Sequence, residues 1–181
     1  MCDLGSRLVR FLALAIGLEE NAWDKNFKNP LALLRLLHYA NEKSAPERGV
    51  YACGAHSDYG MLTILLTDDT TPGLQIYRGG EWIDAPPVHG AFVVNLGDML
   101  ERWTNNNYRS TKHRVLTSGE RHRYSAPFFY EPDFDTVVEC LDVCCSSSNP
   151  PKYSPTTSGL HLLEKYPRQL RRDSTLARCM S

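Results

Sequence analysis

The tripeptide His56-Ser57-Asp58 places an imidazole and a carboxylate two positions apart in a segment with the composition of a strand. Side chains at positions i and i+2 of an extended chain point to the same face, and their Cα atoms lie roughly 6.6 Å apart. Both side chains can therefore reach one metal ion. A pair of this kind is common by chance, so a third ligand has to come from elsewhere in the chain.

His113 is the best candidate for that third ligand, because it lies in a strand-like segment, residues 110–115, that follows Asp58 by 55 residues. Two histidines and one carboxylate leave several positions open on a six-coordinate ion. Non-haem Fe(II) oxygenases need those open positions, because the cosubstrate and O₂ bind to the same ion. The set His56, Asp58 and His113 therefore predicts an Fe(II) centre.

A second pair of polar residues follows ten positions later, at Arg123 and Ser125. These two side chains again share one face of an extended segment. The guanidinium fork of an arginine grips a carboxylate through two parallel hydrogen bonds, and a neighbouring hydroxyl adds a third. The pair is what the far carboxylate of a dicarboxylate cosubstrate requires.

With these three motifs in order, the sequence resembles the isopenicillin N synthase-like Fe(II)/2-oxoglutarate oxygenases. The resemblance runs from about residue 1 to residue 166. It includes four short sequence segments around the motifs, which are Pro72-Gly73-Leu74-Gln75, Gly80-Glu81-Trp82, Asn95-Leu96-Gly97-Asp98 and residues 110–115. The family fold is a double-stranded β-helix, a variant of the jelly roll, and we expect that fold here.

The resemblance implies a role for each matching residue. His56, Asp58 and His113 would bind Fe(II), while Arg123 and Ser125 would bind the C5 carboxylate of 2-oxoglutarate. Tyr39 falls where many members carry a tyrosine that contacts the cosubstrate near the metal. Two neighbours of Tyr39 depart from the family pattern: Leu37 replaces an asparagine, and Ala40 replaces a proline.

The activity that the resemblance implies is oxidation, in most members hydroxylation, of a small organic molecule. The reaction consumes O₂ and 2-oxoglutarate, releases succinate and CO₂, and draws on ascorbate as a reductant. Two alternatives stay open. Some relatives keep the arginine and serine yet are oxidases that do not use 2-oxoglutarate. Family members are also usually much longer, so this chain could be a truncated isoform that is non-catalytic or uncoupled, with uncovered apolar surface and a tendency to aggregate.

Several other residues could contribute to a site. Phe129 shares the face of Arg123 and Ser125 and is either part of the core or a wall of the substrate pocket. Tyr59 is a further candidate for that pocket, although a core position is favoured. Asp98 is interpreted as a turn residue. The remaining histidines have no acidic partner in sequence: His38 is expected in the core or at an edge, His89 on a turn, His122 facing outward and His161 on the surface of a terminal helix.

The elements that must position these side chains are mainly short strands. Turn residues occur about every dozen positions, and Tyr77 to Trp82 has the pattern of a tight hairpin. Residues 31–39 are apolar and could form a helix or a buried strand, because periodicity does not decide between them. Residues 4–16 carry apolar residues at helical spacing, with Asp3 as the expected N-cap and Gly17 as the stop. A second short helix is expected at residues 159–166.

Four segments follow from this pattern. Residues 1–30 form a spine helix and its connection, with Trp23 and Phe27 as anchors, and residues 31–135 form the double-stranded β-helix core. Residues 136–166 form a C-terminal loop and helix, and residues 167–181 a disordered basic tail. The predicted fold class is therefore mainly β, a jelly-roll core with an N-terminal spine helix and a short C-terminal helix.

Composition sets broad limits on partners. The chain has 181 residues, a formal net charge of −1 and a hydrophobic fraction of 42%. These values are ordinary for one globular domain and give no sign of binding to nucleic acid or to an anionic membrane. The six cysteines contain no CxxC pair, so we interpret them as reduced thiols. We expect a cytoplasmic monomer that acts on a small-molecule substrate.

Overall fold

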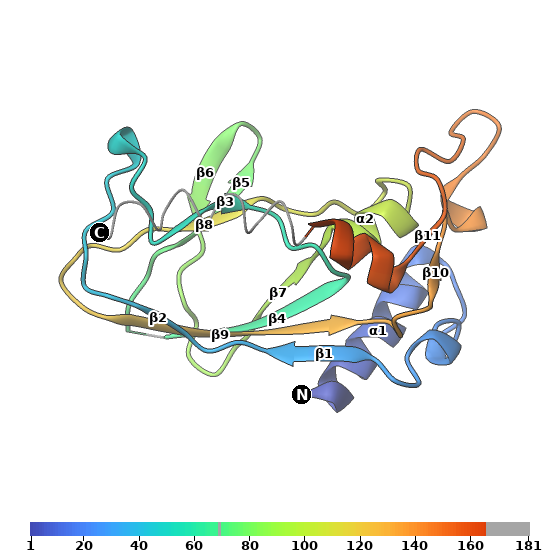
Figure 1. Ribbon diagram of the computed structural model, residues 1–181, viewed down its shortest axis with the longest axis horizontal. Helices are drawn as coiled ribbons and strands as arrows, with labels where there is room; N and C mark the ends of the chain where they lie inside the picture. Colours follow the sequence, from blue (N-terminus) through green and yellow to red (C-terminus); the bar gives the residue numbers. More distant parts are fainter. Residues whose placement is uncertain (69, 166–181) are drawn as a thin grey trace.

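Two antiparallel sheets face each other in the computed structural model, which describes residues 1–68 and 70–165 (Figure 1). The larger sheet has the strand order β1-β9-β4-β7, with β2 also paired to β9, and the smaller sheet has the order β3-β8-β5-β6. The strands are β1 Leu31–Leu34, β2 Leu37–Tyr39, β3 Cys53–His56, β4 Leu62–Thr67, β5 Leu74–Arg78, β6 Glu81–Asp84, β7 Val93–Leu96, β8 His113–Val115 and β9 Arg123–Glu131. This is the jelly-roll architecture that the sequence predicted.

Strand β9 organises the larger sheet, because it pairs with β1, β2 and β4. Its side chains alternate between the two faces of the sheet. Phe128 and Tyr130 point to the outer face and join the main core, whereas Arg123 and Ser125 point between the two sheets. The alternation read from the sequence is thus realised, and it carries the polar residues into the interior of the jelly roll.

Helix α1, Cys2–Ile16, packs on the outer face of the larger sheet. Val9 and Ala13 are buried there, together with Trp23 from the connection that follows. The helix ends where predicted, with Gly17 in the left-handed conformation at φ 93°. The predicted N-cap was wrong: Met1 occupies that position, and Asp3 lies in the first turn, where its charge is favourable to the helix dipole.

Residues 31–39 form strands β1 and β2, which settles the choice that periodicity left open. Strand β1 pairs with the C-terminal half of β9, and β2 pairs with its start. The predicted hairpin is also present, as β5 and β6 joined at Gly79 and Gly80, both with positive φ.

Not all of the larger sheet's outer face lies under α1. Leu34, Leu66, Val94 and Tyr124 share that face with Phe128 and are between 45% and 54% exposed. They form an apolar strip beside the covered area. An uncovered strip of this kind agrees with the expectation of exposed apolar sheet surface.

The segment after β9 runs along one end of the two sheets. It contains the strand pair β10, Val137–Val138, and β11, Thr156–Thr157, and then a helix at residues 158–165. The short 3₁₀ helices are η1 Asp24–Asn26, η2 Pro46–Arg48 and η3 Asp142–Cys144, and a second α-helix, α2, spans Asp98–Trp103. The predicted basic tail, residues 167–181, lies outside the described residues. Within the described ranges, no helix is long and apolar enough to cross a membrane.

Candidate metal centre and cosubstrate site

Paired strands of the smaller sheet bring the three predicted ligands together. His56 ends β3 and His113 begins β8, and the two residues are direct partners across that pair of strands. Asp58 follows β3 by two residues. One ligand atom from each of the three side chains lies within 4.8 Å of the others. The separations are 3.7 Å from His113 Nε2 to Asp58 Oδ1 and 3.9 Å from His56 Nε2 to the same oxygen.

The backbone selects which ring nitrogen of each histidine faces this cluster. His56 Nδ1 lies 2.8 Å from the carbonyl oxygen of Gly54, and His113 Nδ1 lies 3.1 Å from that of Thr111. A carbonyl only accepts, so each Nδ1 carries the proton and donates it. The lone pair of each neutral ring is then on Nε2, on the side of Asp58, which is the arrangement that a metal requires.

Asp58 is a buried carboxylate whose two oxygens have different surroundings. Its side chain is 8% exposed. Oδ1 faces the two histidines, while Oδ2 accepts hydrogen bonds from Thr63 Oγ1 at 2.6 Å and from Asn95 Nδ2 at 2.7 Å. Thr63 and Asn95 are site residues that sequence reasoning missed.

The loop that carries Asp58 is fastened by the start of α2. Three backbone N–H groups donate to its carbonyls: Asp98 to Asp58 at 2.8 Å, Met99 to Gly60 at 3.0 Å and Gly97 to Met61 at 3.0 Å. A Cβ atom on Gly97 would lie 2.2 Å from the Gly60 oxygen, so only glycine permits this approach. The prediction of a turn at Asp98 was wrong in part, since Asp98 begins α2 and its carboxylate bonds to Lys165 Nζ at 2.8 Å.

Strands β2 and β9 place the predicted cosubstrate residues beside one another. Tyr39 is the direct partner of Arg123, and Leu37 is the direct partner of Ser125. The Arg123 side chain is only 1% exposed, and its Nε and Nη1 atoms have no hydrogen-bond partner among the described residues. Burial lowers the pKa of the Arg123 guanidinium. A buried cation with unpaired donors is costly, so the arrangement fits an anionic ligand that supplies the missing acceptors.

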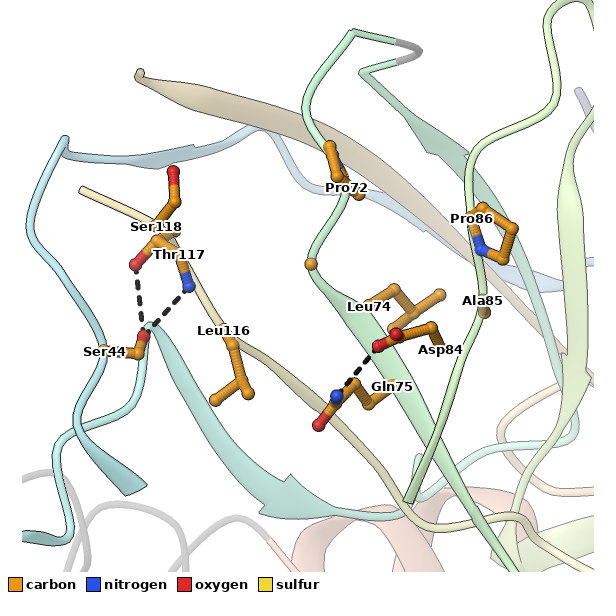
Figure 2. Close-up of a pocket in the computed structure, with 11 residues that line it drawn as sticks. Ser44, Pro72, Leu74, Gln75, Asp84, Ala85, Pro86, Leu116, Thr117 and Ser118 are labelled. Carbon is orange, nitrogen blue, oxygen red and sulfur yellow. Dashed lines mark hydrogen bonds between the residues drawn. The ribbon is translucent and has the colours of Figure 1, made fainter. Parts of the chain in front are cut away.

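A cavity of about 420 Å³ lies beside the smaller sheet, where β5 begins and β8 ends (Figure 2). Gln75 donates to Asp84 there, and Ser44 hydrogen-bonds with Thr117. Gln75 also accepts from Arg114, whose guanidinium lies 4.1 Å from the ring centroid of Trp82. Because Arg114 follows the predicted metal ligand His113 directly, these contacts support the strand that carries this histidine.

The two predicted pocket residues occupy different places. Phe129 is the direct partner of Thr63 in the sheet, so it shares the face of the Asp58 cluster. Tyr59 is half-buried, and its carbonyl accepts a hydrogen bond from His161 Nε2 at 2.8 Å. Their predicted roles against a substrate stay predictions.

Of the histidines outside the cluster, His161 contradicts its prediction and His122 agrees with it. His161 was expected on the surface, but it is 4% exposed on the inward side of the helix at residues 158–165, and burial lowers its pKa. His122 faces outward as predicted, with Nδ1 2.9 Å from His38 Nε2.

The chain has extensive similarity to known proteins. Residues 31–132 match the sequence model of the 2OG-Fe(II) oxygenase superfamily. The 2-oxoglutarate-Fe(II) type oxidoreductase hxnY of Emericella nidulans is 40% identical over 158 residues, which cover 86% of this chain and 45% of that protein. Homoarginine-6-hydroxylase 2-ODD-C23 of Glycine max is 41% identical over 170 residues, which cover 90% of this chain and 51% of that protein.

Solved structures agree with the sequence comparison. A full-length Neurospora crassa protein, crystallised in complex with alpha-KG and thymine, superimposes with a TM-score of 0.84 at 31% identity, over 92% of this chain and 53% of that one. The chain therefore spans about half the length of the relatives that it matches. The match of its core and the likeness of its fold show that the chain belongs to the 2OG-Fe(II) oxygenase superfamily.

Proposed function

We propose that this chain binds Fe(II) through His56, Asp58 and His113 and uses 2-oxoglutarate and O₂ to oxidise a small organic molecule. Hydroxylation is the expected outcome, with succinate and CO₂ as co-products. The donor set fits the metal: two neutral imidazole nitrogens and one carboxylate oxygen are the protein ligands of the non-haem Fe(II) oxygenases. When bound, Fe(II) would supply the redox chemistry that couples decarboxylation of 2-oxoglutarate to oxidation of a C–H bond.

The observation that carries the proposal is the pair of unpaired donors, Nε and Nη1, on the buried guanidinium of Arg123. Its Nε and Nη1 groups would donate to the C5 carboxylate of 2-oxoglutarate in charge-assisted hydrogen bonds. The Ser125 hydroxyl, 8% exposed on the same face of β9, would add a third donor. The ring of Tyr39 lies against the guanidinium and limits the directions in which it can point. These residues would therefore set the orientation of the cosubstrate.

The positions left open by the three protein ligands would be used by the cosubstrate and O₂. His56 and His113 come from one sheet and Asp58 from the loop between the sheets, and these three side chains would hold the metal. The interior between the sheets would shield the reacting atoms from water. Phe129, on the face of that interior, is a candidate contact for the substrate.

The proposed substrate class, a small organic molecule, is supported by the names of similar proteins. Their names identify homoarginine as a substrate, and the solved structures contain thymine in one case and JA in another. All three are small organic molecules, and this supports a small-molecule substrate here.

An anaerobic titration tests the proposal. The purified chain would receive Fe(II) and then 2-oxoglutarate, and the visible charge-transfer band of the Fe(II)-2-oxoglutarate chelate would be recorded. We expect the band in the wild-type chain and its loss in the Asp58→Ala variant. A wild-type chain that binds Fe(II) but gives no band and releases no succinate in air would instead favour an oxidase that does not use 2-oxoglutarate. A chain that binds no Fe(II) would refute the proposal.

A further inference from the structure

The carboxylate of Asp58 receives two hydrogen bonds on one and the same oxygen. Thr63 Oγ1 and Asn95 Nδ2 both donate to Oδ2, at 2.6 and 2.7 Å. Thr63 belongs to β4 and Asn95 to β7, and the two residues are direct partners across that pair of strands. The pairing register of the larger sheet therefore delivers both donors to a single point.

The other oxygen, Oδ1, is directed to the two histidines, at 3.7 Å from His113 Nε2 and 3.9 Å from His56 Nε2. We propose that Thr63 and Asn95 are positioning residues that hold Asp58 as a one-oxygen ligand, with Oδ1 on the metal and Oδ2 kept away from it. This inference rests on the proposed function, because it assumes that the cluster binds a divalent metal.

The physical argument concerns the lone pairs of Oδ2. A carboxylate binds a metal through both oxygens only when the lone pairs of both are free to turn towards the ion. Here the lone pairs of Oδ2 are engaged by two short, charge-assisted bonds in a site where Thr63 is 4% exposed and Asp58 8%. Such bonds are stronger in the protein interior than at its surface. Rotation of the carboxylate to bring Oδ2 onto the metal would break both bonds and leave two donors, Thr63 Oγ1 and Asn95 Nδ2, without an acceptor.

A one-oxygen Asp58 keeps one more position of the metal open than a two-oxygen Asp58 would. The cosubstrate and O₂ together need every position that the three protein ligands leave. Thr63 and Asn95 would thus keep one coordination position of the metal open and would also raise the affinity of the site for the metal. Partners of metal ligands typically contribute about 10- to 100-fold to metal affinity.

Cobalt(II) is the probe for this inference, because its visible absorption reports coordination number and its binding does not depend on turnover. Wild type, Thr63→Val, Asn95→Leu and the double variant would be titrated with Co(II) in the absence of 2-oxoglutarate. We expect the double variant to bind Co(II) about 10- to 100-fold more weakly than wild type, with visible bands of changed position and intensity. Thr63→Ser keeps the donor and should restore the wild-type spectrum.

A matched control separates this effect from the loss of a buried hydroxyl in general. Thr104 is 0% exposed, and its Oγ1 donates to the carbonyl of Leu100 on α2. Thr104→Val should therefore leave Co(II) affinity and the Co(II) spectrum at their wild-type values. If the double variant fails to fold, as judged by circular dichroism, the two single variants and Thr63→Ser decide the question with the same two measurements.

The outcomes distinguish this inference from the proposed function. His56→Ala removes a ligand and must abolish tight Co(II) binding; if it binds like wild type, the metal centre itself is wrongly placed. If His56→Ala loses binding but the Thr63 and Asn95 variants keep both affinity and spectrum, the centre stands and the positioning role is refuted. A weaker affinity with an unchanged spectrum would also contradict the inference, since the ligand mode of Asp58 would then be independent of these donors.

Discussion

The guanidinium of Arg123 lies over the ring of Tyr39, with 5.2 Å between the guanidinium carbon and the ring centroid. The two residues are direct partners on β9 and β2, so the sheet itself sets this stacking. The N–H donors of a guanidinium lie in its plane, so an aromatic ring against one face leaves these donors free for other partners. The donors that remain unpaired, Nε and Nη1, are therefore available to a ligand approaching in that plane.

The first prediction concerns this arginine. Arg123→Leu should weaken 2-oxoglutarate binding by about 3–5 kcal/mol, because it leaves a carboxylate buried without its cation. Fe(II) affinity should stay close to wild type, since Arg123 is not a ligand. Arg123→Lys should rescue only part of the loss, because an ammonium lacks the planar fork. Titration of the charge-transfer band measures both affinities, and an equal loss of Fe(II) and 2-oxoglutarate would argue against this role.

The second prediction concerns the metal ligands. His56→Ala, Asp58→Ala and His113→Ala should each abolish measurable Fe(II) binding, because the described residues bring no fourth donor into the cluster. Equilibrium dialysis under anaerobic conditions measures the bound iron. The matched control is His38→Ala, which removes an exposed histidine whose hydrogen-bond partner is His122, away from the centre. This variant should bind iron with wild-type affinity. Iron bound at full affinity by one of the three variants would remove that residue from the ligand set.

The third prediction concerns Glu131, a carboxyl that is 5% exposed beneath the Asp58 loop. Burial raises its pKa to about 8, the charge of Asp58 adds to the rise, and the N–H of Met61, which donates to the carboxyl, opposes it. A folded-state pKa above the unfolded value means that the folded form holds the proton more tightly. The stability contribution is thus fully present below the unfolded pKa of about 4.5 and is lost as the pH rises through about 8.

Urea denaturation of the metal-free chain at a series of pH values tests this. The wild-type free energy of unfolding should fall, relative to that of Glu131→Gln, by about 1.4 kcal/mol for each pH unit between these two pKa values. The glutamine keeps an oxygen that can accept the Met61 N–H, so its effect isolates the titration. Parallel pH profiles for the two proteins would show that Glu131 is ionised in the folded chain at neutral pH.

The fourth prediction concerns the contact between Gly97 and the Asp58 loop. Gly97→Ala would place a Cβ 2.2 Å from the Gly60 oxygen and 2.9 Å from that of Asp58, so the loop or α2 must move. We expect a loss of about 1–3 kcal/mol in the free energy of unfolding, and weaker Fe(II) binding because Asp58 is displaced. At Gly54, by contrast, an added Cβ meets nothing within 4 Å, so Gly54→Ala is the control. A stable Gly97→Ala variant with normal iron affinity would contradict the account.

The sequence could predict which residues gather at the centre, because the rules involved are local. The spacing of His56 and Asp58 puts both on one side of an extended segment, and the same alternation applies to Arg123 and Ser125. The family resemblance then joined these segments. The role of each side chain as a ligand stays a prediction, but the geometry in which they meet follows from period-two alternation and the pairing of β3 with β8.

The supporting residues could not be found in this way. Thr63 is a single polar residue in an apolar strand, and Asn95 was noted only as part of a segment that matches the family, with no role assigned to it. Their convergence on Asp58 depends on the register between β4 and β7. His161 was assigned to the surface because its own neighbours in sequence are ordinary for an exposed helix. Its burial comes from contact with Tyr59, 102 positions away in the chain. Such pairings are tertiary, so local patterns do not contain them.

Two of the local predictions failed for a related reason. Asp3 and Asp98 are residue types that favour caps and turns, but each was judged from its own type alone. Helix α1 starts earlier, at Cys2, because the N–H of Gly5 donates to the carbonyl of Met1. Asp98 is the first residue of α2, and its own N–H donates to the carbonyl of Asp58. At both helix starts the backbone hydrogen bonds define where the helix begins, and the type of a single residue does not reveal them.

The docking of the terminal helix has a thermodynamic consequence. His161 and Lys165 attach residues 158–165 to Tyr59 and Asp98, one on each side of the contact that fastens Asp58. A ligand that orders the Asp58 loop must therefore strengthen the helix contacts, and by reciprocity a loosened helix must reduce the affinity for that ligand. The helix at residues 158–165 and the predicted ligand Asp58 therefore share one linked equilibrium, and amide exchange in this helix should respond to occupancy of the metal centre.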